Sequence, residues 1–319
     1  MCEMGKIVTL GEVVADIYRE ESASEVEMPF RALPGGAPAN VAVAAARLGA
    51  GAAFVSSVGN DLFGDFIMRA LDAEGVETGA VVRQNSPIRT SLAFVEVFPD
   101  GDREFTFYRS SPAADEELSP DDVKRESLSG ASFANFGSIP LLSEPVRSAT
   151  RRFAELANEL GVPVAFDVNF RAHLWESAEA ARRVVEPMIG LSDIVKLSED
   201  ETAPLLGVED IEAAADDLLE RGVSLALISL GDEGAFYATE DFRGNLPAFE
   251  IESVDATGAG DAFLAATLVH LSETSMDEES VKEAVRRGTA AGAVACTGFG
   301  AMGPLPTRGE LERFMVERG

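Results

Sequence analysis

The stretch VDATGAGDAF, residues 254–263, joins a turn of small residues directly to the start of an apolar helix. Gly258 and Gly260 allow the backbone to approach a ligand closely. We expect the N–H groups of Gly258, Ala259 and Gly260 to point at one spot, where the helix dipole favours an anion. Such a turn can hold a transferring phosphoryl group, and Asp261 can accept a proton from a substrate hydroxyl. A glycine turn with an Asp that caps the helix is the simpler alternative for a lone GxGD.

Outward from this stretch, apolar strands alternate with helices along most of the chain. The strands are predicted at residues 7–10, 53–58, 133–136, 162–166, 194–197 and 225–230. The helices are predicted at residues 40–48, 63–74, 146–160, 178–189, 211–221, 260–271 and 281–296. Strands separated by helices indicate a parallel sheet that is covered on both faces, with ligands beyond the carboxyl ends of the strands. The fold class is therefore predicted to be α/β.

Two segments with a different pattern interrupt this alternation. Residues 13–18 alternate between apolar and polar, and residues 92–97 and 104–108 flank the turn PDGD at 99–102. Alternation around Asp-Gly is typical of a β-hairpin, and such strands fit a small half-exposed sheet. We therefore expect one domain over residues 1–319 that carries a small β-sheet. A homodimer through the open edge of that sheet is a hypothesis.

Composition excludes several classes of function. The 319 residues carry a formal net charge of −29, which disfavours nucleic acid and anionic membranes as partners. Acidic residues greatly outnumber lysines, which is typical of a halophile's proteins, although an ordinary acidic protein is the alternative. Two cysteines cannot form a disulfide framework, and the N-terminus has the pattern of a strand and not of a signal peptide. We expect a soluble, cytoplasmic protein.

A second glycine turn, PGGAPAN at residues 34–40, leads into the first predicted helix. Gly35 and Gly36 allow a tight turn that approaches a ligand closely. Asn40 is expected to lie at the start of the helix and to cap it. From the residues alone, a plain junction between loop and helix is as good an interpretation as a binding site.

Together, the two glycine motifs resemble the PfkB (ribokinase-like) family of carbohydrate kinases, and the resemblance extends from Gly11 to Thr307. It implies a three-layer α/β/α sandwich with a mostly parallel central sheet. It also implies a β-sheet lid over the sugar, built from about residues 12–35 and 89–111. The implied reaction is ATP-dependent phosphorylation of a sugar hydroxyl, with Mg²⁺ and often K⁺. The chain has no GxxxxGK[ST] motif, which agrees with a phosphate cradle at the turn before Asp261.

Within the family, several segments are similar to the fructokinase branch. They are GGAPAN at 35–40, FTFYR at 105–109 and FDVNFR at 166–171, the last with Val168 where that branch has Pro. The 2-keto-3-deoxygluconate kinases share the arginines of the last two segments, which suit a substrate carboxylate. 2-Keto-3-deoxygluconate kinase is therefore the alternative activity, followed by ribokinase or nucleoside kinase. The alternative from another class of function is a catalytically inactive sensor of sugars or nucleotides with the same fold. The resemblance implies that the sugar is bound by Asp16, Gly35, Gly36, Asn40, Tyr108, Arg109, Asp167, Asn169 and Arg171.

The remaining assignments concern ATP and the ions. SLGDEG at 229–234 resembles the family's nucleotide loop, and KLSEDE at 196–201 resembles a segment with a Glu near Mg²⁺. The resemblance assigns the nucleotide and its magnesium to Lys196, Glu201, Ser229, Gly231, Gly234 and Gly260. It assigns K⁺, mostly through main-chain carbonyls, to Asp255, Thr257, Ala295, Gly298 and Gly300. For the segment at 295–301, a glycine-rich turn that covers the adenine is the alternative interpretation.

Overall fold

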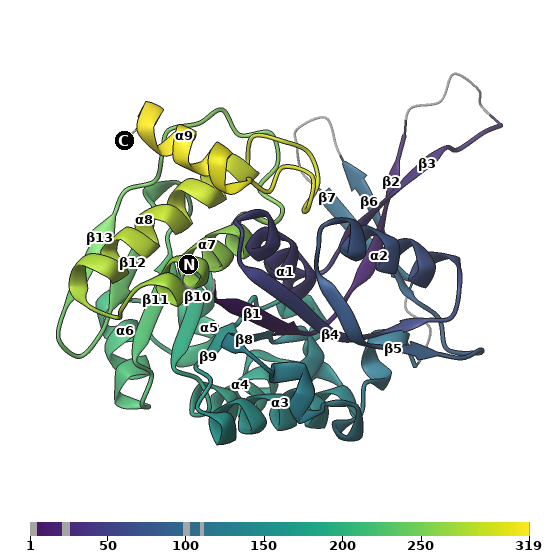
Figure 1. Cartoon of the computed structure of the whole chain (residues 1–319), viewed down its shortest axis with the longest axis horizontal. Helices are drawn as coiled ribbons and strands as arrows, with labels where there is room; N and C mark the ends of the chain where they lie inside the picture. Colours follow the sequence, from purple (N-terminus) through teal and green to yellow (C-terminus); the bar gives the residue numbers. More distant parts are fainter. Residues whose placement is uncertain (1–4, 21–25, 98–102, 109–111, 319) are drawn as a thin grey trace.

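A nine-stranded sheet forms the centre of the protein, as seen in a computed structural model that describes residues 5–20, 26–97, 103–108 and 112–318 (Figure 1). Its strand order is β13-β12-β11-β10-β9-β8-β1-β4-β5. The strands from β11 to β5 run parallel, and β12 and β13 add an antiparallel edge. Their bounds are β1 Lys6–Leu10, β4 Gly51–Gly59, β5 Glu77–Gln84, β8 Ala131–Gly137, β9 Val164–Asp167, β10 Ile194–Ser198, β11 Leu225–Ser229, β12 Ala235–Ala238 and β13 Arg243–Leu246.

Helices cover both faces of this sheet, as the alternation of strands and helices predicted. Their bounds are α1 Ala37–Arg47, α2 Leu62–Ala73, α3 Val146–Leu160, α4 Ala178–Ile189, α5 Glu199–Leu206, α6 Ile211–Glu220, α7 Ala259–Glu273, α8 Glu278–Ala295 and α9 Arg308–Arg318. Successive side chains of a strand point to opposite faces, so Ile7 joins the core beneath α1, α7 and α8, whereas Val8 joins the core against α3, α4 and α6. The α/β fold class and the three layers are confirmed.

A separate four-stranded sheet, here called the small sheet, lies beside the main sheet (Figure 1). It has the order β3-β2-β6-β7, with bounds β2 Val14–Arg19, β3 Phe30–Gly35, β6 Ser91–Val97 and β7 Arg103–Tyr108. The strand pairing of the predicted hairpin is confirmed, because β6 and β7 pair antiparallel, and its predicted turn at 99–102 lies outside the described residues. Asp61 caps α2 and also accepts hydrogen bonds from the backbone and hydroxyl of Thr90, so it fixes the point where the chain enters β6.

Arg47, at the C-terminal end of α1, ties three distant parts of the chain together. Its guanidinium makes a forked ion pair with Glu74, with N–O distances of 2.8 and 2.6 Å. The same group donates to the carbonyls of Met302, Gly303 and Leu305 at 2.8, 3.1 and 2.8 Å. The segment that follows α8 is thereby anchored to α1. Among the described helices, none has both the length and the apolar character that a membrane span requires.

Replacement of Arg47 by Met should lower the free energy of unfolding by about 1–3 kcal/mol, because several partly buried acceptors lose their donor. Arg47→Lys should recover only part of this loss, since an ammonium lacks the planar fork. Urea unfolding of both variants measures the effect. The exposed pair Arg151–Glu155 supplies the control, because Arg151→Met should cost less than about 0.5 kcal/mol. Equal losses for Arg47→Met and Arg151→Met would contradict the anchoring role.

Candidate active site

A cavity of about 860 Å³ lies at the carboxyl ends of the central strands, where the sheet topology predicted a ligand site. Residues at the ends of β9, β10 and β11 line it, and Val14 and Ala93 of the small sheet line it as well. Most of the predicted site residues meet there. They are Asp16, Gly36, Asn40, Asp167, Asn169, Arg171, Lys196, Glu201, Ser229, Asp255, Thr257, Gly258, Gly260 and Asp261.

The two glycines of the first motif make room for the acidic residues beside them. A Cβ atom on Gly35 would lie 2.2 Å from Oδ2 of Asp16, a buried carboxylate on β2. Gly36 has a φ of 112°, and a Cβ atom there would lie 2.5 Å from the carbonyl oxygen of Glu12. Gly35 itself is not part of the cavity wall, so its contribution is the space that Asp16 occupies.

Asn40 does not cap a helix, and that prediction is wrong. Helix α1 begins three residues earlier, at Ala37, with Gly36 as the N-cap and Pro38 in the first turn, where the missing N–H of proline has no cost. Asn40 therefore lies inside the helix and is buried. Its side-chain nitrogen donates to Oδ2 of Asp261 at 2.7 Å. The two motifs that the sequence analysis singled out thus meet in a direct hydrogen bond.

The second motif forms a turn into α7. Gly258 is the N-cap in the left-handed region, with a φ of 82°, and a Cβ atom there would lie 2.8 Å from the carbonyl oxygen of Ala301. The expectation of three free N–H groups is wrong for Ala259, because its N–H donates to Ala256 O at 3.2 Å. Within the described part of the chain, the N–H groups of Gly258 and Gly260 have no hydrogen-bond acceptor. They remain available for an anion at the N-terminus of a 15-residue helix.

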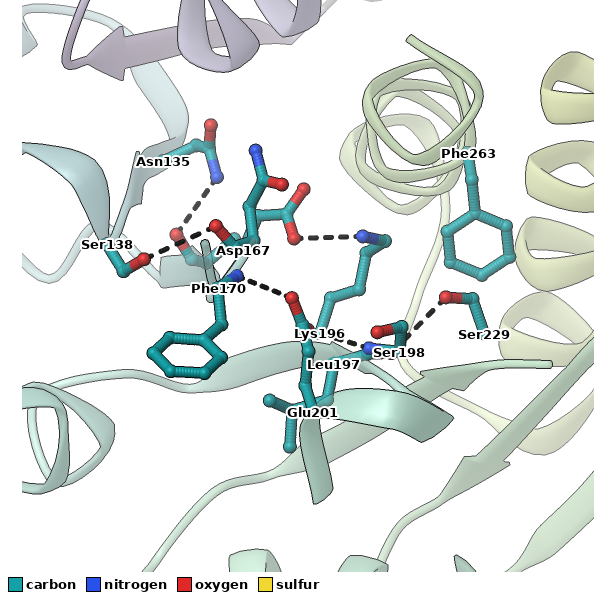
Figure 2. A network of polar contacts seen from close by, with 12 residues as sticks. Asn135, Ser138, Asp167, Phe170, Lys196, Leu197, Ser198, Glu201, Ser229 and Phe263 are labelled. Atoms are coloured by element: carbon teal, nitrogen blue, oxygen red, sulfur yellow. Dashed lines mark hydrogen bonds and ion pairs between the residues drawn. The ribbon is translucent and has the colours of Figure 1, made fainter. Parts of the chain in front are cut away.

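Figure 2 shows a pair of buried charges formed by Lys196 and Asp167. Lys196, on β10, donates from Nζ to Oδ1 of Asp167, at the end of β9, at 2.9 Å, and both side chains are almost fully buried. A Cβ atom on Gly260 would lie 3.1 Å from Nζ of Lys196. Glycine at 260 therefore lets a cation lie against the N-terminus of α7.

Glu201 orders the loop that follows β9. One of its oxygens accepts from the N–H of Phe170, and the other accepts from the N–H of Ser198 at 2.8 Å, which caps α5 (Figure 2). Asn169 in the same loop has a φ of 42°, a strained conformation that is typical of functional sites and that Asn tolerates best. Both carboxylate oxygens of Glu201 are thus occupied by backbone donors.

Burial raises the pKa of Asp261 to about 6, and the neighbouring charge of Asp167 contributes to the increase. The hydrogen bond from Asn40 and the positive charges of Lys196 and Arg171 oppose this increase. Burial lowers the pKa of Lys196, but Asp167 and Glu201 raise it more, so the net pKa is raised. At neutral pH, Lys196 is therefore a cation and Asp261 is mostly an ionised carboxylate that can accept a proton.

Asp255 connects the turn before α7 to the segment after α8. Its oxygens accept from the N–H of Thr257 at 2.8 Å and from the N–H of Gly300 at 2.7 Å. The predicted ion residues Ala295, Gly298 and Gly300 do not form part of the cavity wall. A Cβ atom on Gly298 would lie 2.7 Å from Cβ of Pro304, so this glycine allows close packing within the segment.

The remaining predicted residues lie away from the cavity or outside the described residues. Arg109 is outside the described residues. Tyr108 is 63% exposed and packs on Phe94 instead of lining the cavity. Gly231 and Gly234 do not line it either, and a Cβ atom on Gly234 would lie 2.0 Å from the carbonyl oxygen of Leu246.

Several lining residues were missed by the sequence analysis. They are Glu12, Ile139, His173, Leu174, Ser198 and Ser253. The first three follow the ends of β1, β8 and β9, so their position after a strand was the signal that could have identified them.

Comparison with known proteins places the chain in a family. The model described as "pfkB family carbohydrate kinase" matches residues 4–308. Fructokinase-1 from Oryza sativa subsp. japonica is 41% identical over 318 residues, which cover 97% of each chain. Fructokinase-1 from Zea mays is 41% identical over 314 residues, which cover 96% of each chain.

Solved structures agree with this result. A fructokinase with bound ATP from Xylella fastidiosa superposes with a TM-score of 0.89 at 32% identity and covers 98% of both chains. A fructokinase double mutant from Vibrio cholerae O395, described as bound to fructose, ADP and potassium ion, gives a TM-score of 0.86 at 31% identity, with 98% of both chains covered. The chain belongs to the pfkB family of carbohydrate kinases and is a phosphotransferase that acts on a sugar hydroxyl.

Proposed function

We propose that this protein is an ATP-dependent fructokinase, which transfers the γ-phosphoryl group of ATP to a hydroxyl of fructose. The observation that carries the proposal is the position of Asp261: an ionisable carboxylate in the same cavity wall as the open N–H groups at the start of α7. The similarity to rice and maize fructokinases, and to fructokinase structures described with ATP or with fructose and ADP, supports the choice of substrates.

The arrangement of the side chains suggests how the reaction proceeds. Asp16 hydrogen-bonds sugar hydroxyls from the small-sheet side of the cavity, and Asp261 receives the proton of the attacking hydroxyl. The new O–P bond forms as the bond from the γ-phosphorus to the leaving ADP oxygen breaks. The N–H groups of Gly258 and Gly260 and the ammonium of Lys196 stabilise the negative charge on the phosphoryl oxygens.

The side chains in the cavity fit a magnesium ion that is bound mainly by the phosphates of the nucleotide and only indirectly by the protein. No group of three or more His, Cys, Asp or Glu side chains in the described residues could hold a metal ion, and both oxygens of Glu201 accept from backbone. Mg²⁺ keeps several waters and binds substrate phosphates, so Glu201 would act on it through water. When bound, the ion neutralises charge on the phosphate oxygens.

We also propose a K⁺ site near Asp255, which the potassium ion named for the Vibrio cholerae fructokinase supports. The carboxylate of Asp255 accepts from two backbone N–H groups, so its part is to hold the turn and the segment after α8 together. The ion would then be held mostly by main-chain carbonyl oxygens of these two segments, as the resemblance implied for Thr257, Ala295, Gly298 and Gly300.

The small sheet is proposed to be the lid over the sugar. Asp16 reaches the cavity from it, and Val14 and Ala93 form part of the cavity wall. A homodimer through this sheet is a further proposal, supported by the exposed aromatic side chains of Phe30 and Tyr108 on its edge strands. One domain over residues 1–319 and a cytoplasmic location remain predictions.

The charge of the cavity favours a neutral sugar over a sugar acid. Glu12, Asp16 and Asp261 line the cavity, and Lys196 is already paired with Asp167. Among the described residues of the cavity wall, Arg171 is the arginine that a substrate carboxylate would meet beside these negative charges, and Arg109 lies outside the described residues. 2-Keto-3-deoxygluconate is therefore the weaker candidate, although Arg171 keeps it the leading alternative.

Fructose should be the preferred acceptor. Coupled measurement of ADP release gives kcat/KM for fructose, ribose and 2-keto-3-deoxygluconate with ATP and Mg²⁺. We expect fructose to exceed both by at least tenfold, which corresponds to about 1.4 kcal/mol of transition-state binding. A tenfold preference for 2-keto-3-deoxygluconate would show that the substrate assignment is wrong.

Asp261→Asn should lose about 10²–10⁴-fold in kcat and retain ATP and fructose binding. The folded-state pKa of Asp261 is raised, so its ionisation opposes folding: stability is lost as pH rises from about 4 to 6. The free energy of unfolding of the variant should therefore exceed that of the wild type by roughly 2–3 kcal/mol at pH 7, and by less than about 1 kcal/mol at pH 4. Urea unfolding at both pH values and steady-state kinetics measure these effects. If the variant keeps activity within threefold of wild type, Asp261 is not the base and only contributes to the start of α7.

A further inference from the structure

Asn40 contacts the proposed base from a different helix. It lies inside α1, which packs against α7, and it is 221 positions from Asp261 in sequence. Its Nδ2 donates to Asp261 Oδ2 at 2.7 Å, and the two residues are only 3% and 7% exposed. Its Oδ1 is buried and has no partner among the described residues. A buried acceptor without a partner costs stability, so the fold gains little from this amide beyond the bond to Asp261.

The hydrogen bond determines which oxygen of Asp261 the substrate meets. The terminal torsion of an Asp side chain is broad and roughly two-fold, so a carboxylate without a fixed partner can rotate and exchange its oxygens. The bond from Asn40 occupies Oδ2 and fixes the plane of the group. In the described residues, Oδ1 of Asp261 receives no hydrogen bond, which leaves it for a ligand in the cavity that Asp261 lines.

We propose that Asn40 is a positioning residue that holds Oδ2 of Asp261, so that Oδ1 faces the attacking hydroxyl. Oδ1 takes the hydroxyl proton while the oxygen bonds to the γ-phosphorus and ADP leaves with the electrons of the broken P–O bond. This inference rests on the proposed role of Asp261 as the base. It assigns to Asn40 a function in the chemical step that is distinct from any contact with the sugar.

The charges around Asp261 predict how the loss of Asn40 changes the pH dependence. Asp167 on β9, Lys196 on β10 and Arg171 in the loop after β9 act on this carboxylate, and Asn40 acts on it from α1. An N–H donor favours the ionised form, so its removal makes Asp261 harder to ionise. A carboxylate at position 40 would add a second negative charge and increase the effect.

The test uses two variants with the branched shape of Asn: Asn40→Leu, without polar atoms, and Asn40→Asp, without the donor but with a charge. We expect kcat to fall about 10- to 100-fold in both, which is less than the 10²–10⁴-fold loss expected when the base itself is removed. The acid limb of the kcat profile should move up by about one pH unit in Asn40→Leu and further in Asn40→Asp. Asn158→Asp is the matched control, because among the described residues that amide donates only to the carbonyl of Leu191. The kcat profile of this variant should stay in place.

A double-mutant cycle with Asp261→Asn separates positioning from sugar binding. If Asn40 acts through Asp261, Asn40→Leu should change kcat less than twofold in the Asp261→Asn enzyme. An unchanged acid limb, or equal kcat losses in both backgrounds, would overturn the proposal while leaving Asp261 as the base. Asp261→Asn activity within threefold of wild type would overturn both assignments together. Should Asn40→Leu melt below the assay temperature, the shift of the acid limb in Asn40→Asp, which is nearly isosteric with Asn, decides the proposal in the Asp261 enzyme alone.

Discussion

The burial of the Asp261 carboxylate beside the Asp167–Lys196 ion pair is the interaction on which the site depends. A buried carboxylate is expensive unless donors and cations surround it. Lys196, the amide of Asn40 and the N-terminus of α7 provide these, and Asp167 keeps the ammonium in place. The balance leaves Asp261 with a pKa of about 6, low enough for it to be ionised at neutral pH and high enough for it to take a proton.

Helix α1 holds the parts of this site in one frame. Its first turn follows Gly36, beside Glu12, and its middle presents Asn40 to Asp261. Its last residue, Arg47, binds the carbonyls of the segment that follows α8. The sugar side, the proposed base and the segment near the proposed ion site are therefore fixed to one rigid element. A displacement of α1 would disturb all three at once, which agrees with its almost complete burial.

The sequence predicted the features that depend on local patterns. Buried parallel strands are continuous apolar runs, and α3 and α4 begin and end at the predicted residues. Partly exposed β5 and β13 and the polar helix α9 lack such a pattern and were missed. Strand β12 was missed although it is a buried apolar run, because it is only four residues long. The glycine turns were found because close approach requires glycine. The pairing of Asn40 with Asp261 could not be found, because no local pattern reports a contact between residues 221 positions apart. For the same reason, the occupied N–H of Ala259 became visible only once the turn was folded.

The protonation of Asp261 in the free protein is the most direct test of this charge arrangement. NMR titration of protein labelled with ¹³C at the aspartate carboxyl carbons, with the Asp261 signal assigned from Asp261→Asn, reports it without catalysis. We expect this carbon to titrate with a midpoint of about 6, well above the ordinary value for aspartate of about 3.9. A midpoint at or below about 4 would show that Asp261 is neither desolvated nor influenced by Asp167 as the geometry requires.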